Sequence, residues 1–516
     1  MPSEKIPAEF GDGSIDLCFD TIKKGKQALV FVNAKRSAEK TAEELSKRIK
    51  PSEAKFFEIA DSALKALSKP TKQCERLAFC LRKGIAFHHA GLAAKQRELI
   101  EDNFRAGIIK IICATPTLAF GLDLPAYRSI IKDLRRYGSH GYNWIPVLEY
   151  LQQAGRAGRP GYDKLGEAIV IAGSEAEKDA IYERYILGSP EDIHSKLAVE
   201  PVLRTYLLSL IAANFVRTKE QIMSFFERTF WAQQFEDMEK LEMIIDKMLR
   251  LLEEWEFISM DQGDFQDADE VGSGKIAATI MGKRVAELYI DPLTANFLIN
   301  CLRNASDRHV KDLSFLHMVS HTLEMRPLLR VKAKETDKVQ EFISLNHGYF
   351  LENEPSLYDP EYDEYFDSVK TAMMLNDWID EKDEEYLLEE YNVRPGELRV
   401  KLDNSDWLMY SAEEMARILH FQKLIKDIRK ARLRVQYGVK EELLPLLKLE
   451  QIGRMRARRL YNNKIKDVGD IKSTDLMKLI QILGEKTAMH VKKQVGEEVK
   501  EVPEGKRKGQ ISLRDY

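Results

Sequence analysis

Two arginines with a fixed spacing carry the strongest chemical signal in the sequence. They lie in residues 152–159, QQAGRAGR, which have the form Q-x-x-G-R-x-G-R. A guanidinium group can place two N–H donors on phosphate oxygens and stabilise the charge that develops during phosphoryl transfer. We therefore interpret Gln152, Arg156 and Arg159 as catalytic candidates, and both arginines also as phosphate ligands. The two glycines would let this backbone approach a facing domain.

A second segment, residues 114–125 with the sequence ATPTLAFGLDLP, directly follows a predicted buried strand. Ligands of α/β sheets bind at the carboxyl ends of the strands. The hydroxyl groups of Thr115 and Thr117 could hold a nucleic-acid backbone there. The Asp123 carboxylate could accept a hydrogen bond from a ribose or orient an arginine, and we group Gly121 with it as a nucleotide-binding candidate.

Two weaker segments offer further donors to phosphates. Residues 31–37 read FVNAKRS and residues 87–92 read FHHAGL. We interpret Asn33, Arg36, His89 and Gly91 as contacts to a nucleic-acid backbone. Adjacent histidines in an extended segment point in opposite directions, so we predict no metal site here.

Alternating strands and helices must position these segments. Between residues 28 and 172, short apolar runs alternate with amphipathic stretches. Such a pattern is typical of a parallel sheet covered on both faces by helices. The predicted strands are 28–32, 108–114, 129–134 and 167–172, and the first predicted helix is 37–49.

The remainder of the chain is predicted to be mainly helical, because apolar residues recur there at i, i+3 and i+4. Three helices followed by a two-stranded hairpin are typical of a winged helix. Further on, the sequence predicts a long helical region, a compact set of short helices and a disordered polar tail. The corresponding ranges are 203–215, 219–228, 238–255, the hairpin 257–260 and 275–280, the helical region 291–438 with an acidic, Tyr-rich loop at 352–367, the short helices 441–495, and the tail 501–516.

Composition limits the class of protein. The chain has 516 residues, a 44% hydrophobic fraction and a formal net charge of -4. Any nucleic-acid surface must therefore arise from local segregation of charge. Five cysteines are too few for a disulfide scaffold, and neither a membrane-spanning run nor a signal sequence is apparent. We expect a reduced, multidomain, cytoplasmic protein without membrane contact.

Taken in order, the three segments resemble motifs IV, IVa, V and VI of the second RecA-like domain of superfamily 2 helicases. Residues 131–150, which include Arg136 and Tyr137, resemble the β-hairpin insertion of Ski2-like helicases. With its helical second half, the chain resembles the archaeal Ski2-type DNA helicases of the Hjm type. This resemblance implies that the hairpin acts as a wedge between DNA strands, and that Arg136 and Tyr137 contact DNA.

The resemblance also implies an architecture and an activity. It predicts an α/β RecA-like domain followed by mainly α domains, in an ATP-dependent 3′–5′ DNA helicase that unwinds branched or stalled forks in repair and recombination. Its partners would be single-stranded and forked DNA. The predicted domains are the RecA-like domain 1–188, the winged helix 189–290, the helical ratchet domain 291–438, the helix-hairpin-helix domain 439–500 and the tail 501–516.

One ratchet helix of this family lies along the translocating strand, and we place it at residues 395–419. The family implies that Trp407 stacks on a base, with Arg399 on the same broad face of the helix. From the residues alone, a core position for Trp407 is favoured over base stacking. Lys401 is an alternative basic partner for it.

Residues 451–461, QIGRMRARRLY, resemble the hairpin of a helix-hairpin-helix motif. A helix N-terminus after a tight turn presents backbone amides to phosphate, and the arginines add salt-dependent attraction. Gln451 stands where such hairpins usually have a first glycine, so the tight turn is open to question. Arg454, Arg456 and Arg458 are DNA-binding candidates, or alternatively a solvated face.

The tail contains a further short match. Gln510, Leu513 and Tyr516 fit the pattern Q-x-x-L-x-x-aromatic. This spacing resembles a sliding-clamp peptide, and the alternative is a tail without a partner.

An ATP-driven helicase needs a P-loop and an acidic Mg²⁺ motif, and the sequence contains neither. The lookalike at residues 272–275, GSGK, lacks the upstream glycine and is followed by Ile276. We therefore expect ATP and Mg²⁺ to be shared with a missing first RecA-like domain, which could be a separate partner. A truncated product, one half of a split helicase and a relic that only binds DNA all fit. A non-catalytic DNA-binding adaptor and an RNA helicase of the same superfamily are the alternative functions.

Overall fold

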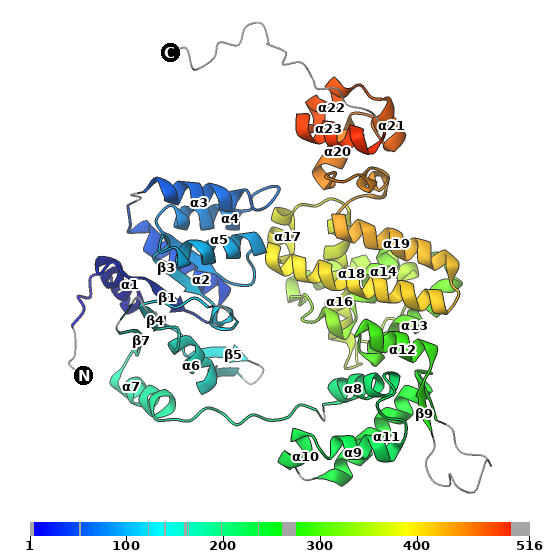
Figure 1. Cartoon of the computed structure of the whole chain (residues 1–516), viewed down its shortest axis with the longest axis horizontal. Helices are drawn as coiled ribbons and strands as arrows, with labels where there is room; N and C mark the ends of the chain where they lie inside the picture. Colours follow the sequence, from blue (N-terminus) through cyan, green and yellow to red (C-terminus); the bar gives the residue numbers. More distant parts are fainter. Residues whose placement is uncertain are drawn as a thin grey trace.

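The computed structural model describes residues 5–50, 53–121, 123–138, 141–158, 163, 165–197, 199–235, 237–260 and 275–496. Its first part is an α/β unit (Figure 1). The elements of this unit are α1 (Gly13–Lys23), β1 (Ala28–Phe31), α2 (Lys35–Lys47), α3 (Ala54–Leu64), α4 (Lys72–Leu81), β2 (Ile85–His88), α5 (Ala94–Arg105), β3 (Ile111–Ala114), the 3-10 turn η1 (Pro116–Ala119), β4 (Arg128–Ile131), β5 (Arg135–Gly138), β6 (Gly141–Trp144), α6 (Val147–Ala154), β7 (Glu167–Val170), α7 (Glu175–Ile181) and the π-helical turn η2 (Tyr182–Ile186).

Five of these strands form one parallel sheet in the order β2-β3-β1-β4-β7. Strands β1 to β4 are buried along their whole length, as expected when helices cover a parallel sheet. The predicted α/β domain is confirmed. Its predicted strand 108–114 is shorter, because α5 ends in a turn at Gly107, whose φ is +74°. The predicted strand 129–134 ends at Ile131, where the chain leaves the sheet for the antiparallel hairpin β5–β6.

A group of helices with a two-stranded hairpin follows an extended linker (Figure 1). The structure thus has the helices and the wing that the sequence predicts here, together with a short helix, α10, that it does not. The elements are α8 (Glu200–Ala212), α9 (Lys219–Phe226), α10 (Phe230–Phe235), α11 (Met238–Glu254), β8 (Ile258–Met260), β9 (Ile276–Ala278) and α12 (Ile280–Leu288).

The long helical region comes next. Its predicted acidic loop 352–367 is wrong over its second half, because α16 already begins at Tyr362 and buries Tyr365 and Phe366 in the core. The elements are α13 (Pro292–Ser306), α14 (Asp312–Ser320), η3 (Leu323–Met325), η4 (Ala333–Glu335), α15 (Thr336–Asn346), η5 (His347–Tyr349), α16 (Tyr362–Ile379), α17 (Glu384–Tyr391), α18 (Pro395–Ile418) and α19 (Gln422–Tyr437).

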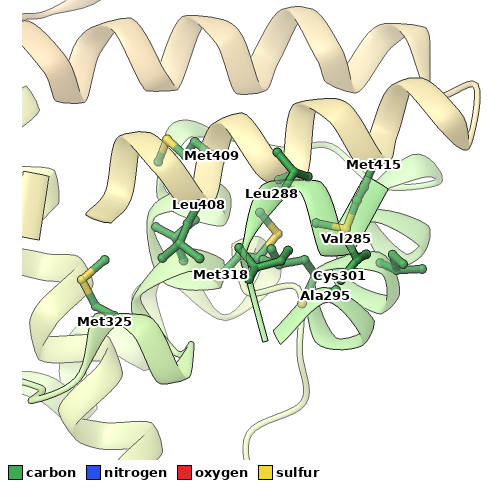
Figure 2. Packing of buried hydrophobic residues seen from close by; sticks show 14 of the residues in the cluster. Val285, Leu288, Ala295, Cys301, Met318, Met325, Leu408, Met409 and Met415 are labelled. Carbon is green, nitrogen blue, oxygen red and sulfur yellow. The ribbon is translucent and has the colours of Figure 1, made fainter. Parts of the chain in front are cut away.

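One hydrophobic core runs from Leu203 to Val435 and joins the predicted winged-helix and ratchet domains. Figure 2 shows its methionine-rich centre, where α18 packs over α12, α13 and α14. The labelled side chains there are Val285, Leu288, Ala295, Cys301, Met318, Met325, Leu408, Met409 and Met415. Because the two predicted domains share this core, we expect them to behave as one rigid unit.

The last described part has a separate core between Val439 and Val491. It contains η6 (Glu441–Leu443), η7 (Leu446–Lys448), α20 (Arg454–Asn462), α21 (Val468–Ser473), α22 (Leu476–Leu483) and α23 (Glu485–Gln494). All five cysteines of the chain are buried and unpaired. Within the described ranges, no helix has the length and apolar character needed to cross a membrane.

The α/β unit and the helical unit meet through two glycines. The Gly396 N–H, in the first turn of α18, donates to the Gly91 carbonyl at 3.1 Å. A Cβ atom on Gly396 would lie 2.2 Å from the Ala90 carbonyl oxygen and 2.4 Å from that of Leu92. Because these neighbours are backbone atoms, only glycine permits this approach.

We predict that Gly396→Ala weakens the contact between the two units, so that the α/β unit unfolds at a lower temperature. The added methyl group meets backbone that cannot rotate away, so we expect a loss of about 1–3 kcal/mol of stability. Calorimetry of the whole chain should show the α/β transition at a lower temperature than in the wild type. Gly348→Ala is the matched control, since a Cβ atom there meets nothing within 4 Å. An unchanged transition in Gly396→Ala would contradict the tight contact.

Candidate nucleotide and DNA interface

The arginine motif and the segment after β3 lie side by side. Arg156 follows the end of α6, and its Nη2 donates to the Ala119 carbonyl at 2.5 Å. The chain then pairs with the other segment, since Ala126 N donates to Arg156 O and Gly158 N donates to Ala126 O. The two strongest sequence signals therefore form one continuous edge beside the sheet.

This edge leaves several of the predicted residues accessible. Gln152 on α6, Gly121 and Asp123 are exposed, and Arg156 is half-buried. Gly121 has a φ of +74°, the left-handed conformation that glycine adopts without strain. Arg159 lies outside the described residues. An amide, a carboxylate and part of a guanidinium are thus accessible along this edge, and their contacts to phosphate and ribose stay a prediction.

The glycines of the motif are used inside the domain. Gly158 has a φ of +95°, and a Cβ atom on the facing Gly166 would lie 2.2 Å from Gly158 N. Two backbones therefore cross here at the closest possible distance. This packing accounts for a glycine at position 158, so the approach of a facing domain is not needed to explain it.

Thr115 and Thr117 form a pair of hydroxyl groups at the carboxyl end of β3. Their Oγ1 atoms are 3.0 Å apart. Thr115 is nearly buried, whereas Thr117 is exposed on η1. Thr117 can therefore reach a phosphate directly, while Thr115 orients its neighbour's hydroxyl group.

Asn33 joins the carboxyl end of β1 to the hairpin β5–β6. Its Nδ2 donates to the Asp133 carbonyl at 3.1 Å and to the Arg135 carbonyl at 2.6 Å. Its own N–H donates to an Asp133 carboxylate oxygen at 3.2 Å. Both donors of the side-chain amide thus hold the base of the hairpin, so Asn33 positions the hairpin and has no free N–H for DNA.

The hairpin projects two exposed tyrosines. Tyr137 and Tyr142 face each other across β5 and β6, with ring centroids 5.0 Å apart. Arg136 is paired with the nearly buried Glu149 at 2.9 Å. Burial raises the pKa of Glu149, and the Arg136 guanidinium offsets only part of that rise. Tyr137 is therefore free to touch DNA, whereas Arg136 is tied to α6.

His89 and Gly91 lie buried at the contact with α18. The His89 side chain has an exposed fraction of 0%. Its Nδ1 accepts from Gly91 N at 3.1 Å, which leaves the proton on Nε2, 3.1 Å from Glu39 Oε1. No atom of this ring is accessible to DNA in this arrangement, so the structure gives His89 and Gly91 packing roles.

Glu39, on the buried face of α2, is the centre of that contact. Its carboxylate accepts from His89, from Gln73 at 2.9 Å, from Arg76 at 2.7 Å and, across the two units, from Arg394 at 3.4 Å. Burial alone would raise the pKa of Glu39, but these hydrogen bonds and the two arginine charges outweigh it and lower the pKa to about 2. Glu39 is therefore ionised at neutral pH.

Sequence reasoning missed Glu39 and Arg394 as interface residues. Within α2, Glu39 lies next to Ala38 on the side that buries Ala42 and Leu45. A charged residue on the apolar face of a predicted helix was the signal available.

Arg36, by contrast, is exposed and lines a cavity of about 600 Å³ at this junction, together with Lys332 and Arg394.

The helix α18 confirms the predicted helix at 395–419 and distinguishes the two basic partners proposed for Trp407. Lys401 is buried, and its Nζ donates to the Met325 and Pro327 carbonyls at 3.0 and 2.8 Å. Arg399 is 68% exposed and pairs with Asp403 at 2.9 Å. Of these two, only Arg399 can reach a nucleic acid.

Trp407 itself is half-buried against the core. Its Nε1 donates to the Leu288 carbonyl of α12 at 2.9 Å, which fixes the ring. The ring is thus a core residue with one accessible part. Base stacking on that part stays a prediction.

The turn predicted at residues 451–453 forms although it lacks the usual first glycine. Gln451 adopts the left-handed conformation with a φ of +64°, and Gly453 precedes α20. Arg454 lies over the Trp378 ring at 4.7 Å, and Arg458 pairs with Glu381 at 2.5 Å and Glu442 at 2.9 Å. Arg454 and Arg458 therefore attach this unit to the helical core.

Arg456 is exposed and donates to the Gln451 carbonyl at 2.7 Å. It supports the unusual turn with one N–H, and the rest of its guanidinium faces solvent. Of the three predicted arginines, Arg456 is the one best placed to meet DNA.

The parallel sheet and the arginine edge are those of a class of protein, the second RecA-like domain of a helicase, here followed by a largely helical region. Residues 62–161 match the family model described as helicase conserved C-terminal domain, and residues 313–438 match that described as archaeal helicase, domain 4. The chain belongs to the Hel308 family of archaeal ATP-dependent DNA helicases.

Three relatives illustrate the match. The ATP-dependent DNA helicase Hel308 of Pyrococcus abyssi is 39% identical over 503 residues, which are 96% of this chain and 67% of the relative. Hel308 of Pyrococcus horikoshii is 39% identical with the same coverage, and Hel308 of Methanococcus vannielii is 36% identical over 93% of this chain and 67% of its own. The chain thus spans about two thirds of the relatives' length.

The residues present fit one side of an ATP site. Arg156, Gln152 and Asp123 offer a cation, an amide and a carboxylate at one edge. The sequence has no P-loop to cradle a triphosphate. Within the ranges that the structure covers, no three His, Cys, Asp or Glu side chains are arranged to hold a metal ion.

We predict that His89 makes the domain contact sensitive to mild acid. Burial lowers the pKa of His89 below its ordinary value of 6.5. Below that pH the unfolded chain takes up a proton that the folded chain does not, so the free energy of unfolding falls as the pH drops. The Glu39 contribution has the same sign but is lost only as the pH falls from 4.5 toward 2.

The measurement is urea unfolding at about pH 7 and about pH 5.5, a window in which His89 titrates in the unfolded state. His89→Gln should lose less stability between the two pH values than the wild type, by up to about 1 kcal/mol. His347→Gln, at an exposed histidine, is the control and should match the wild type. Equal losses in all three proteins would contradict the prediction.

Proposed function

We propose that this chain is the motor-completing and DNA-gripping portion of an ATP-dependent 3′–5′ DNA helicase that acts on branched or stalled forks. One observation carries the proposal. The arginine edge of the RecA-like unit and the N-terminal end of α18 both adjoin the same sheet, one through Ala126 and the other through Gly91. A change at the nucleotide edge could therefore be passed to the helix predicted to hold DNA.

The proposed roles at the nucleotide edge rest on the accessibility of the described residues and, for Arg159, on the sequence motif alone. Arg156 and Arg159 contact the ATP phosphates from the side opposite the P-loop, and Gln152 helps to orient them. Asp123 and Gly121 link the nucleotide to the segment after β3 whose threonines contact DNA. ATP with Mg²⁺ supplies the driving reaction, and the P-loop and Mg²⁺ ligands come from a first RecA-like domain.

The proposed DNA contacts begin beside this edge. Thr117, oriented by Thr115, holds the strand backbone, and Tyr137 on the hairpin separates the duplex. Arg399 and Trp407 follow the single strand along α18, and Arg456 meets DNA beyond it. A sliding-clamp contact through Gln510, Leu513 and Tyr516 stays a prediction, because these residues lie outside the described ranges.

The test of the motor role is DNA-stimulated ATP hydrolysis by this chain alone and after addition of a separately expressed first RecA-like domain. We expect hydrolysis only on mixing. Replacing Arg156 and Arg159 together by Ala should lower the rescued rate at least about 1,000-fold, the usual effect of losing an arginine finger, with DNA affinity nearly unchanged. Arg48→Ala, at an exposed arginine of the same unit, is the control.

Other outcomes separate the alternatives. Hydrolysis by the chain alone would mean that it holds a complete nucleotide site. DNA binding without rescue would make the chain a DNA-binding adaptor. An equal loss of hydrolysis and DNA affinity in the double variant would contradict the phosphate role of the arginines.

We predict that Trp407→Ala weakens single-strand binding by about 1–3 kcal/mol, the usual contribution of one stacked base. Fluorescence anisotropy of a labelled oligonucleotide measures this loss, and circular dichroism checks that the fold survives. Trp407→Phe is the control, because it keeps a ring but loses the N–H bond to Leu288. Unchanged affinity in Trp407→Ala would make the residue purely a core side chain.

A further inference from the structure

The helix α19 concentrates positive charge in an acidic chain. Between Gln422 and Tyr437 it has six basic residues and a single acidic one, Asp427. The whole chain has a formal net charge of -4. Such local segregation is what a nucleic-acid surface requires in a protein of this composition. The basic residues are Lys423, Lys426, Arg429, Lys430, Arg432 and Arg434.

Two of these six charges serve the fold. Arg434 is buried and pairs with Asp312. Arg432 pairs with Asp406 at 2.8 Å and lies over the Tyr410 ring at 4.9 Å. The other four form what we call the basic face of α19: Lys423, Lys426, Arg429 and Lys430.

The basic face of α19 is only partly neutralised. Arg429 is 56% exposed and shares the buried Glu413 carboxylate with Arg417. Lys430 lies 3.4 Å from the exposed Glu441. Lys423 and Lys426 are exposed, and no described residue gives either Nζ an ion pair or a hydrogen bond. The N-terminal half of this face therefore carries two positive charges that no described carboxylate neutralises.

The spacing of three lysines along α19 matches the spacing of phosphates along a DNA strand. Lys423, Lys426 and Lys430 follow one another at i, i+3 and i+7, so they share one side of the helix and repel one another. From Lys423 to Lys430 the helix rises about 10 Å, at 1.5 Å per residue. That length corresponds to roughly three phosphates along one DNA strand, which repeat about every 3.4 Å of helix axis. A phosphate backbone would relieve the repulsion.

The basic face of α19 does not lie where the predicted single strand lies. The Trp407 ring reaches toward α12, where its N–H bonds to Leu288. In Figure 1, α12 lies on one side of α18 and α19 on the other, and α19 faces α20. Lys440, just beyond α19, and Arg459 of α20 are also exposed. A strand held by Trp407 would therefore not occupy this face.

The chemistry of the face selects a duplex. The exposed side chains along it are lysine, arginine, glutamine and Leu433, with no exposed aromatic ring among its described residues. Proteins that hold single strands combine basic groups with aromatic rings on which bases stack. Basic groups alone suit a duplex, which presents its phosphates and hides its bases.

We propose that the basic face of α19 binds the phosphate backbone of a duplex DNA arm, distinct from the strand that lies along α18. This proposal rests on the proposed DNA-gripping function and adds a second DNA contact to it. Branched DNA has several arms, so one molecule would hold the single strand on α18 and a duplex arm on α19.

The test compares Lys423→Gln/Lys426→Gln with the wild-type chain on three probes: a single strand, a blunt duplex, and a fork with one duplex arm and a single-stranded tail. We expect duplex and fork affinities to fall about tenfold at low salt, and the slope of log K against log salt to fall by about 2, one for each lost phosphate contact. Single-strand affinity should stay within twofold. Lys47→Gln/Lys55→Gln, at two exposed lysines of the α/β unit, is the matched control.

Each alternative result overturns the proposal in a recognisable way. Equal affinities of variant and wild type for the fork would remove the α19 site while leaving the DNA-gripping function intact. An equal loss on the single strand would place α19 on the single-strand path. A wild-type chain that binds none of the three probes would overturn the proposed function together with this site.

Discussion

The arrangement of the two large units depends on one buried carboxylate. Glu39 is 2% exposed and accepts hydrogen bonds from His89, Gln73, Arg76 and Arg394. A buried charge is tolerated only when it is paired and its lone pairs are satisfied. Three of the donors come from the α/β unit and one from the N-terminal cap of α18. Any rotation of α18 away from the sheet would therefore remove a charged partner from an already desolvated group.

The loops at the carboxyl edge of the sheet are used in two ways, some for packing and some left exposed. After β1 and β2, the loops are used for packing, since Asn33 holds the hairpin and His89 and Gly91 meet α18. After β3, Thr117, Gly121 and Asp123 stay exposed beside Arg156. Because the sheet order begins β2-β3-β1, the loop open to ligand lies between the two loops that are used for packing. A change at the open loop would therefore reach the contact with α18 through a single neighbouring strand, β2.

The sequence predicted the elements better than the partners of individual side chains. Periodicity and turn residues located the parallel strands and the wing, because these signals are local, whereas the family resemblance located α18. The sequence could not reveal that Lys401 donates to the carbonyls of Met325 and Pro327, or that Arg458 pairs with Glu381. Such contacts join residues about 75 positions apart. The acidic stretch ending at residue 367 was predicted as a loop on its charge, whereas burial of Tyr365 and Phe366 decided for a helix. Gln451 shows the converse, since tertiary contacts of Arg454 and Arg458 hold a turn for which the local residue is poorly suited.

Lysine–carboxylate pairs line the junction between the two units. The α/β unit presents lysines to the junction, and the helical unit answers with carboxylates from α17 and α18: Lys69 with Asp383, Lys72 with Glu385 and Glu389, and Lys35 with Glu397. Isolated pairs of this kind add little stability, but several acting around a desolvated centre fix one orientation. They also consume much of the acidic face of α17. Lys423 and Lys426 of α19 have no such carboxylate partner among the described residues, so the positive charge that a polyanion would meet lies on α19 and not at the junction.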